Sequence, residues 1–119
     1  MEKLAKMALL EDFYGPLLTA KQRNVWDLHY QRDLSLAEIA ELEHISRQAI
    51  HDLLKRTERI LEEYEDKLGL VQRFWTQREK LSKVESLLYE LTEQDFSNLI
   101  AWERHQQIRK MIEEVFTDF

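Results

Sequence analysis

Two helix-start signals enclose a short break in the stretch 35–54, SLAEIAELEHISRQAIHDLL. Ser35 is followed three residues later by Glu38, which makes the reciprocal capping box that starts a helix. That helix should end at His44, because histidine is one of the few residue types besides glycine that are enriched at positive φ. Ser46 then caps a second helix. The stretch therefore predicts a helix-turn-helix unit, in which a turn of three residues joins two helices.

The apolar residues of this stretch predict how the two helices pack. The positions that face inward are Ile39, Ala40, Ile45, Ile50 and Leu53. The outer face of the second helix then carries Arg47, Gln48, His51, Asp52 and Lys55. Most of these side chains can donate hydrogen bonds to base edges or phosphates in a major groove. Any amphipathic helical hairpin shows the same pattern, including one that docks on protein, because a fold does not fix a function.

Five residues of the second helix are the candidate nucleic-acid contacts. In a major groove, Arg47 and Gln48 would contact base edges, with His51 beside them. Lys55 and Arg59 would reach phosphates on the backbone. The helix dipole does not favour an arginine near a helix start, so the position of Arg47 favours a functional role.

The charge of the whole chain opposes this interpretation, whereas the local charge supports it. Net charge is −6 and the isoelectric point is about 5.2, whereas nucleic-acid-binding domains are typically basic. Between residues 46 and 59, four basic side chains outnumber Asp52 and Glu58, which gives a local charge of +2. Charges act locally, over about 10 Å in 0.1 M salt. Asp52 lies on the outer face itself, where phosphates would repel its carboxylate.

The residues around the motif resemble the promoter-reading C-terminal region of bacterial sigma factors. The resemblance lies in LTAKQR at 18–23, LSLAEIA at 34–40 and ISRQAI at 45–50. Within that superfamily, the chain is most similar to the YlxM-type family, small helix-turn-helix proteins of Gram-positive bacteria. The similarity covers Leu4 to Gly69 well and is loose after that. His44 departs from the usual pattern, because glycine is commonest at this position of the turn.

This resemblance implies a regulatory protein whose architecture is that of a DNA-binding protein. It also implies a gene beside those of the signal recognition particle GTPase and its receptor, and hence a role in that pathway. In the alternative, the chain does not bind DNA but docks on that GTPase, on its receptor or on the RNA of the particle. The acidic isoelectric point fits such partners if they are basic.

Long helices account for most of the chain. Two glycines and one proline in 119 residues leave little for turns, so we expect an all-α protein. The second helix of the motif should run on to Gly69, a typical C-terminal stop. At about 22 residues it would be about 33 Å long, more than a recognition helix needs. We therefore expect a helix-turn-helix domain with a long fourth helix at 1–69, followed by a C-terminal helical hairpin at 70–119.

The C-terminal hairpin should carry an apolar stripe on each helix. One stripe is Leu70, Phe74, Arg78, Leu81, Val84, Leu88 and Leu91; the other is Phe96, Leu99, Ile100, Ile108, Met111, Ile112, Val115 and Phe119. Thr92 with Asp95 would cap the second helix. Ser82 with Glu85 is another capping pair, so residues 70–91 form either one helix or two. Aromatic residues beyond these stripes favour contact with another subunit or partner, and we expect a homodimer.

The residue types needed for catalysis are missing or badly spaced. The chain has no cysteine, no His-Glu-x-x-His zinc spacing and no glycine-rich phosphate loop. Glu41 and His44 have the spacing of a di-iron ligand pair, but His44 lies at the helix break. We therefore expect neither an enzyme nor a metal or other cofactor. The N-terminus has no apolar run long enough for a signal peptide or membrane span, so we expect a cytoplasmic protein that does not contact a membrane.

Overall fold

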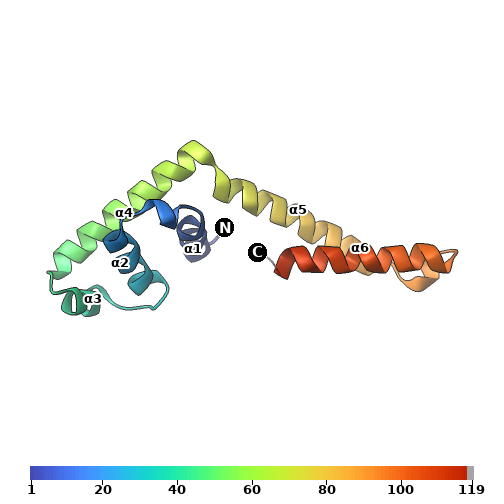
Figure 1. Ribbon diagram of the computed structural model, residues 1–119, viewed down its shortest axis with the longest axis horizontal. Helices are drawn as coiled ribbons and strands as arrows, with labels where there is room; N and C mark the ends of the chain where they lie inside the picture. Colours follow the sequence, from blue (N-terminus) through green and yellow to red (C-terminus); the bar gives the residue numbers. More distant parts are fainter. Residues whose placement is uncertain (118–119) are drawn as a thin grey trace. The chain divides into compact units, whose positions relative to one another are not determined.

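The computed structural model describes residues 1–117, and Figure 1 shows its elements. Within that range all regular structure is helical, so the predicted all-α fold is confirmed. The α-helices are α1 (Lys3–Tyr14), α2 (Ala20–Tyr30), α3 (Leu36–Glu43), α4 (Arg47–Leu68), α5 (Leu70–Glu90) and α6 (Leu99–Thr117). Two short 3₁₀ helices, η1 (Gly15–Leu17) and η2 (Glu93–Asp95), follow α1 and α5. In the described part of the chain, no helix is long and apolar enough to cross a membrane.

The chain divides into two compact units, and the division falls inside α5. Unit 1 comprises residues 1–73, and unit 2 begins at residue 74. The first turn of α5 therefore belongs to unit 1. The boundary expected from the sequence, between residues 69 and 70, coincides with the end of α4. The roles assigned to the two parts stay predictions.

Capping residues begin three helices of unit 1, and two of them, Ser35 and Ser46, are those predicted above. The Thr19 hydroxyl accepts from the Gln22 amide (3.2 Å), and the Gln22 side chain accepts from the Thr19 amide (3.0 Å). Ser35 makes the same reciprocal pair with Glu38, with both distances at 3.1 Å. The Ser46 hydroxyl accepts from the amide of the third residue of α4, at 3.0 Å. Each cap satisfies an amide that the helix leaves unpaired, so these predictions are confirmed.

Left-handed residues end α3 and α4, as predicted. His44 has φ 56° and closes α3, with its amide donating to the Ala40 carbonyl. Gly69 has φ 63° and closes α4, with its amide donating to the Glu65 carbonyl. A glycine adopts this conformation without strain, whereas a histidine does so at some cost. Asp33 also has a positive φ, 58°, which the sequence did not indicate.

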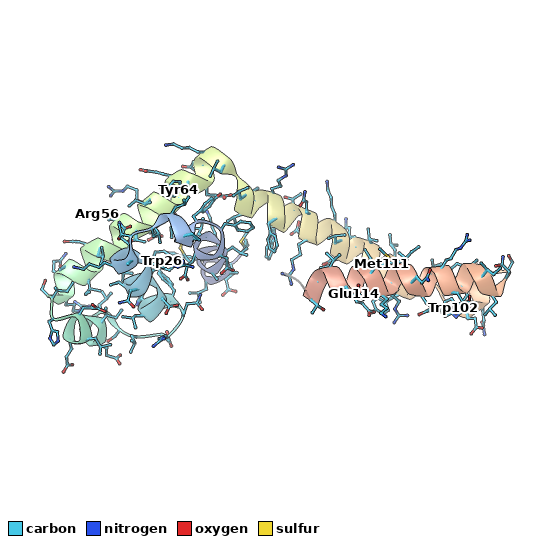
Figure 2. All side chains as sticks on the ribbon, in the orientation of Figure 1. Trp26, Arg56, Tyr64, Trp102, Met111 and Glu114 are labelled. Atoms are coloured by element: carbon cyan, nitrogen blue, oxygen red, sulfur yellow. The ribbon has the colours of Figure 1, made fainter. Side chains whose placement is uncertain are left out.

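The core of unit 1 is built on α4, against which α1, α2 and α3 pack. Its largest buried side chains include Trp26 of α2, labelled in Figure 2, and Ile39 of α3. Along α4, Ile50 and Leu61 are fully buried at helical spacing. Thr57 is buried between them, and its hydroxyl donates to the Leu53 carbonyl at 2.8 Å. Burying a large apolar side chain contributes about 1.5–3 kcal/mol, so the orientation of α4 about its own axis is strongly fixed.

Two residues predicted to lie on the buried face are less buried than expected. Ile45 and Leu53 are half-buried at the edge of the core. Leu68, at the end of α4, is 56% exposed and does not belong to the core. The reason is local: α5 begins directly after Gly69, and Val71, only 1% exposed, fills this end of the core instead.

A half-buried carboxylate links α1, α4 and the first turn of α5. The Tyr14 hydroxyl donates to Oε1 of Glu65 at 2.6 Å and accepts from the Leu70 amide at 3.1 Å. The same Glu65 carboxylate accepts from the amides of Val71 (2.9 Å) and Gln72 (3.0 Å). Three amides that α5 leaves unpaired at its start are thus satisfied from outside the helix. Sequence spacing gave no sign of this cap, because Tyr14 lies far from Glu65 along the chain.

The same contacts shift the pKa of both side chains. Burial raises the pKa of Glu65, but the hydrogen bonds from Tyr14, Val71 and Gln72 together outweigh burial and lower it. Burial, and then the hydrogen bond to Glu65, raise the pKa of Tyr14. The carboxylate therefore stays ionised, since all its partners donate to it.

Unit 2 is a helical hairpin whose first helix is unbroken. The helix α5 runs through Ser82 to Glu90, which settles the alternatives left open for residues 70–91 in favour of one helix. Thr92 and Asp95 do form a capping box, but it opens η2 rather than α6. The cap of α6 is Asn98, whose side-chain oxygen accepts from the Ala101 amide at 2.8 Å.

Aromatic and polar contacts hold the hairpin together at two places. His105 is 4% exposed; its Nε2 donates to the Leu88 carbonyl (2.7 Å), and its ring stacks on Trp102 at 5.1 Å. Further along, the Arg109 guanidinium lies 3.8 Å from the centre of the Tyr89 ring, and the Tyr89 hydroxyl donates to the Glu113 carboxylate.

Much of the predicted apolar stripe of α6 is not buried within unit 2. Leu99, Ile100 and Met111 are each more than 60% exposed, and Ile108 is 49% exposed; Figure 2 labels Met111. These side chains stay uncovered because each helix of a pair can cover only one side of the other. Phe119, the last residue of the predicted stripe, lies outside the described residues.

Candidate nucleic-acid interface

The helix-turn-helix unit consists of α3, the turn at residues 44–46 and α4. Ile39 and Ala40 hold α3 against the core, and Ile50 holds the start of α4. The Ile45 amide also donates to the Ala40 carbonyl, at 3.2 Å, which tightens the turn. The residues that face away from this packing are those available to a ligand.

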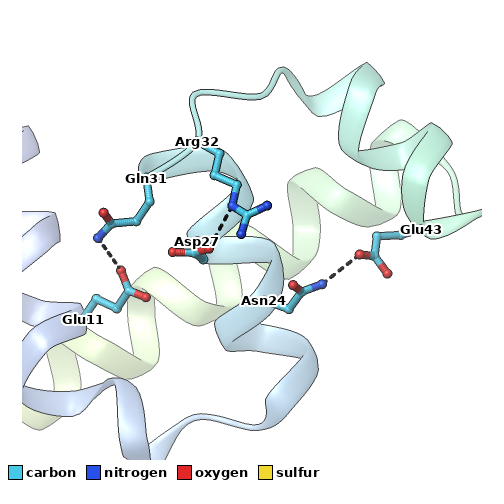
Figure 3. A network of polar contacts seen from close by, with 6 residues as sticks. All are labelled: Glu11, Asn24, Asp27, Gln31, Arg32 and Glu43. Carbon is cyan, nitrogen blue, oxygen red and sulfur yellow. Dashed lines mark hydrogen bonds and ion pairs between the residues drawn. The ribbon is translucent and has the colours of Figure 1, made fainter.

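Hydrogen bonds between side chains tie α2 and the residue after it to the neighbouring helices α3 and α1 (Figure 3). Asn24 of α2 donates to Glu43, the last residue of α3, at 2.8 Å. Gln31, which follows α2, donates to the buried Glu11 of α1 at 3.0 Å. The middle of α2 is thereby tied to α3, and the residue after α2 is tied to α1.

All five predicted contacts are exposed residues of α4: Arg47, Gln48, His51, Lys55 and Arg59. From the first to the last of them the helix rises about 18 Å. Three of these five residues, Arg47, Lys55 and Arg59, are cations that form no ion pair within residues 1–117. Their charge is therefore available to an external anion. That the five residues contact nucleic acid stays a prediction.

Asp52 occupies the middle of this exposed surface and engages two of the predicted contacts. Its Oδ1 accepts from the Gln48 side-chain amide at 3.0 Å. The same oxygen lies 3.6 Å from Nδ1 of His51. Gln48 can therefore contact a base edge only with its remaining donor and its oxygen, unless it leaves Asp52. The carboxylate also weakens the positive potential over the first turns of α4.

Two hollows flank α4. One, of about 450 Å³, is lined by Lys21, Ile45, Ala49, Asp52, Leu53 and Arg56. The other, of about 180 Å³, is lined by Lys3, His29, Tyr30, Leu36, His51, Leu54, Lys55 and Glu58, and is called the Lys3 hollow below. The Lys3 hollow includes two of the predicted contacts, so that they face residues of α1 and α2 as well as solvent.

The sequence missed Lys3 and His29 as neighbours of these contacts. Nζ of Lys3 lies 3.9 Å from a carboxylate oxygen of Glu58 on α4. Nδ1 of His29 lies 2.9 Å from the Leu34 carbonyl, so this nitrogen carries the proton. Neither spacing nor composition could have indicated them, because only the fold of α1 and α2 over α4 brings them there.

The described residues offer no place for a metal ion of the kinds that side chains usually hold. Within residues 1–117, no three histidine, aspartate or glutamate side chains converge as ligands.

Comparison with known proteins gives a family and close relatives. The family described as "Putative helix-turn-helix protein, YlxM / p13 like" matches residues 1–102. A UPF0122 protein of Bacillus mycoides is 52% identical over 90 residues, which cover 76% of this chain and 82% of the relative. One from Desulforamulus reducens is 50% identical over 88 residues, 74% of this chain and 75% of the relative. One from a Thermoanaerobacter species is 46% identical over 109 residues, 92% of this chain and 86% of the relative.

Proposed function

Because this chain belongs to the YlxM/p13-like family of helix-turn-helix proteins, we propose that it is a regulatory protein that binds duplex DNA with α4. The observation that carries the proposal is that three of the exposed cations on α4, Arg47, Lys55 and Arg59, form no ion pair within residues 1–117. They lie on a helix whose opposite side is fixed in the core.

The contacts proposed follow from the chemistry of each side chain. Arg47 and Gln48, in the first turn of α4, contact base edges, where arginine suits guanine and glutamine suits adenine. His51 lies beside them, and Lys55 and Arg59 bind phosphates. Neutralising about two phosphates gives a salt slope of about −1.8 per protomer, which is shallow. Specific binding therefore needs two half-sites and a dimer.

Unit 2 is the proposed source of that dimer. Its exposed apolar side chains are Val84, Leu87, Leu91, Leu99, Ile100, Ile108, Met111 and Val115. A hairpin of this size buries too little apolar surface to be stable by itself, and a second copy would supply the missing cover. We propose a homodimer in which these faces pack together.

Fluorescence anisotropy of a labelled mixed-sequence duplex tests DNA binding. Titrations at about 50 mM and 200 mM salt, up to about 10⁻⁴ M protein, cover the range of non-specific binders. We expect binding that weakens with salt and is lost in the double variant Arg47→Ala/Lys55→Ala. The control Lys67→Ala/Arg73→Ala removes the same charge from exposed positions of unit 1 that lie outside the five proposed contacts. Equal loss in both variants, or no wild-type binding at low salt, would overturn the proposal.

A second candidate function is an accessory role in the signal recognition particle pathway. The observation that favours it is the acidity of the chain, −6 overall, together with Asp52 in the middle of the α4 surface. In that case the helix-turn-helix or unit 2 docks on the GTPase, its receptor or the RNA of the particle. Titration of each purified component distinguishes the two functions: saturable binding to one of them, with no binding to DNA, would replace the first proposal.

A further inference from the structure

We propose that Lys3, at the start of α1, binds a backbone phosphate of the DNA duplex and so extends the interface beyond the helix-turn-helix. This inference rests on the proposed function. Lys3 lies in the wall of the Lys3 hollow, next to Lys55 and Glu58 of α4. The ligand is a phosphodiester oxygen, and the hollow is where it approaches.

The position of the hollow along α4 matches the edge of a major groove. Lys55 lies eight residues after Arg47, which is about 12 Å along the helix. A major groove of B-form DNA is about 12 Å wide. When the first turn of α4 contacts base edges, Lys55 is therefore level with the phosphates that border the groove. Lys3 reaches the same level from a different helix.

Lys3 is free to make this contact. Its side chain is 71% exposed, and its ion pair with Glu58 is long, at 3.9 Å. The Glu58 side chain is only 17% exposed, but the Lys3 ammonium stands in solvent and is held loosely at this distance, so it can turn to another anion. A lysine ammonium has three donors and tolerates many approach directions, so it can bridge Glu58 and a phosphate. Glu58 thus holds Lys3 beside the hollow but also offsets its charge.

His29, which also lines the hollow, does not fit this role when it is neutral. His29 donates from Nδ1 to the Leu34 carbonyl, which leaves Nε2 as an acceptor. A phosphate oxygen offers only acceptors to such a nitrogen. Without Lys3, the formal charges of Lys55 and Glu58 would cancel; with it, the hollow carries +1. Lys3 therefore decides whether this flank attracts or ignores a phosphate.

The salt dependence of duplex binding tests the assignment. We compare wild type, Lys3→Gln and Lys67→Gln, a matched control that removes one exposed lysine of unit 1 at the other end of α4. Each lost phosphate contact reduces the salt slope by about 0.9 per protomer. Between about 50 and 200 mM salt, the affinity of wild type should therefore fall about 3.5-fold more than that of Lys3→Gln. Lys67→Gln should keep the wild-type slope.

The variant Glu58→Gln should change the affinity for the duplex in the opposite direction. It removes the carboxylate that offsets Lys3, so this variant should bind the duplex more tightly than wild type at low salt. If Lys3→Gln keeps the wild-type slope while Arg47→Ala/Lys55→Ala abolishes binding, this inference is overturned and the proposed function stands. If wild type does not bind the duplex at all, the proposed function fails and takes the inference with it.

Discussion

At the scale of single residues, Glu65 illustrates how one carboxylate fixes the end of one helix and the start of the next. It accepts hydrogen bonds from Tyr14 and from two amides of α5. Each bond is made to the charged form, and hydrogen bonds to charged groups contribute about 1.5–3 kcal/mol. Protonation of Glu65 should therefore weaken the whole junction between α4 and α5.

We predict that Glu65→Gln lowers the free energy of unfolding at pH 7 by about 1.5–3 kcal/mol, measured by urea denaturation. The folded pKa of Glu65 is lowered from an ordinary value of 4.5. Its contribution is thus fully present above about pH 4.5 and is lost as the pH falls through the folded pKa. The stability difference between wild type and Glu65→Gln should accordingly shrink from pH 7 to pH 3. Glu62→Gln, an exposed change on the same helix, should show no such trend.

The candidate site was only partly predictable at this scale. Exposure of Arg47 and Lys55 follows from helical spacing once the apolar residues are assigned to the core. Contacts between distant segments do not follow from spacing. The approach of Lys3 to Glu58 and the bond of Tyr14 to Glu65 both depend on how α1 lies on α4.

At the scale of elements, local signals predicted most of the helix boundaries. Serine and threonine caps and the left-handed stops at His44 and Gly69 act over three or four residues, so a sequence displays them directly. The possible break at Ser82 did not form. Extending an existing helix costs less than starting a new one, and no glycine or proline interrupts α5. A capping pair alone therefore does not end a helix.

Substitutions at the two left-handed residues that end α3 and α4 should change the free energy of unfolding in opposite directions. His44→Gly should raise the free energy of unfolding by about 0.5–1 kcal/mol, because glycine relieves the strain of φ 56° but makes the unfolded chain more flexible. Gly69→Ala should lower it by about 1 kcal/mol. No atom lies within 4 Å of the added Cβ at position 69, so its cost is that of the backbone alone. Thermal unfolding of both variants measures the effects, and a loss of stability in His44→Gly would contradict the argument.

At the scale of the whole molecule, the two units differ in how they use their apolar residues. Unit 1 encloses a core around Trp26 and Ile50. Unit 2 leaves Leu99 and Met111 largely exposed. The sequence pattern could not separate these cases, because an apolar stripe looks the same whether it packs within the chain or against another molecule.

We predict that Met111→Glu shifts the protein from dimer to monomer in sedimentation equilibrium, since a charge in an apolar interface is strongly disfavoured. Each chain has a mass of 14.5 kDa, so the two states are easily resolved. Lys110→Gln, an exposed neighbour, makes the same change in net charge and should leave the dimer intact. An unchanged mass for Met111→Glu would place the interface elsewhere.

Asp52 has a consequence for how such a regulator would behave in a cell. Nearly all the DNA that the protein meets is not its target, and bulk DNA competes by virtue of its abundance. The Asp52 carboxylate lies among the proposed DNA contacts and repels the phosphates of any duplex, whatever its sequence. The exception is a site where a cytosine amino group can donate a hydrogen bond to it. The protein would then bind non-target DNA more weakly and would search the genome faster. The same repulsion would lower its affinity for its own site.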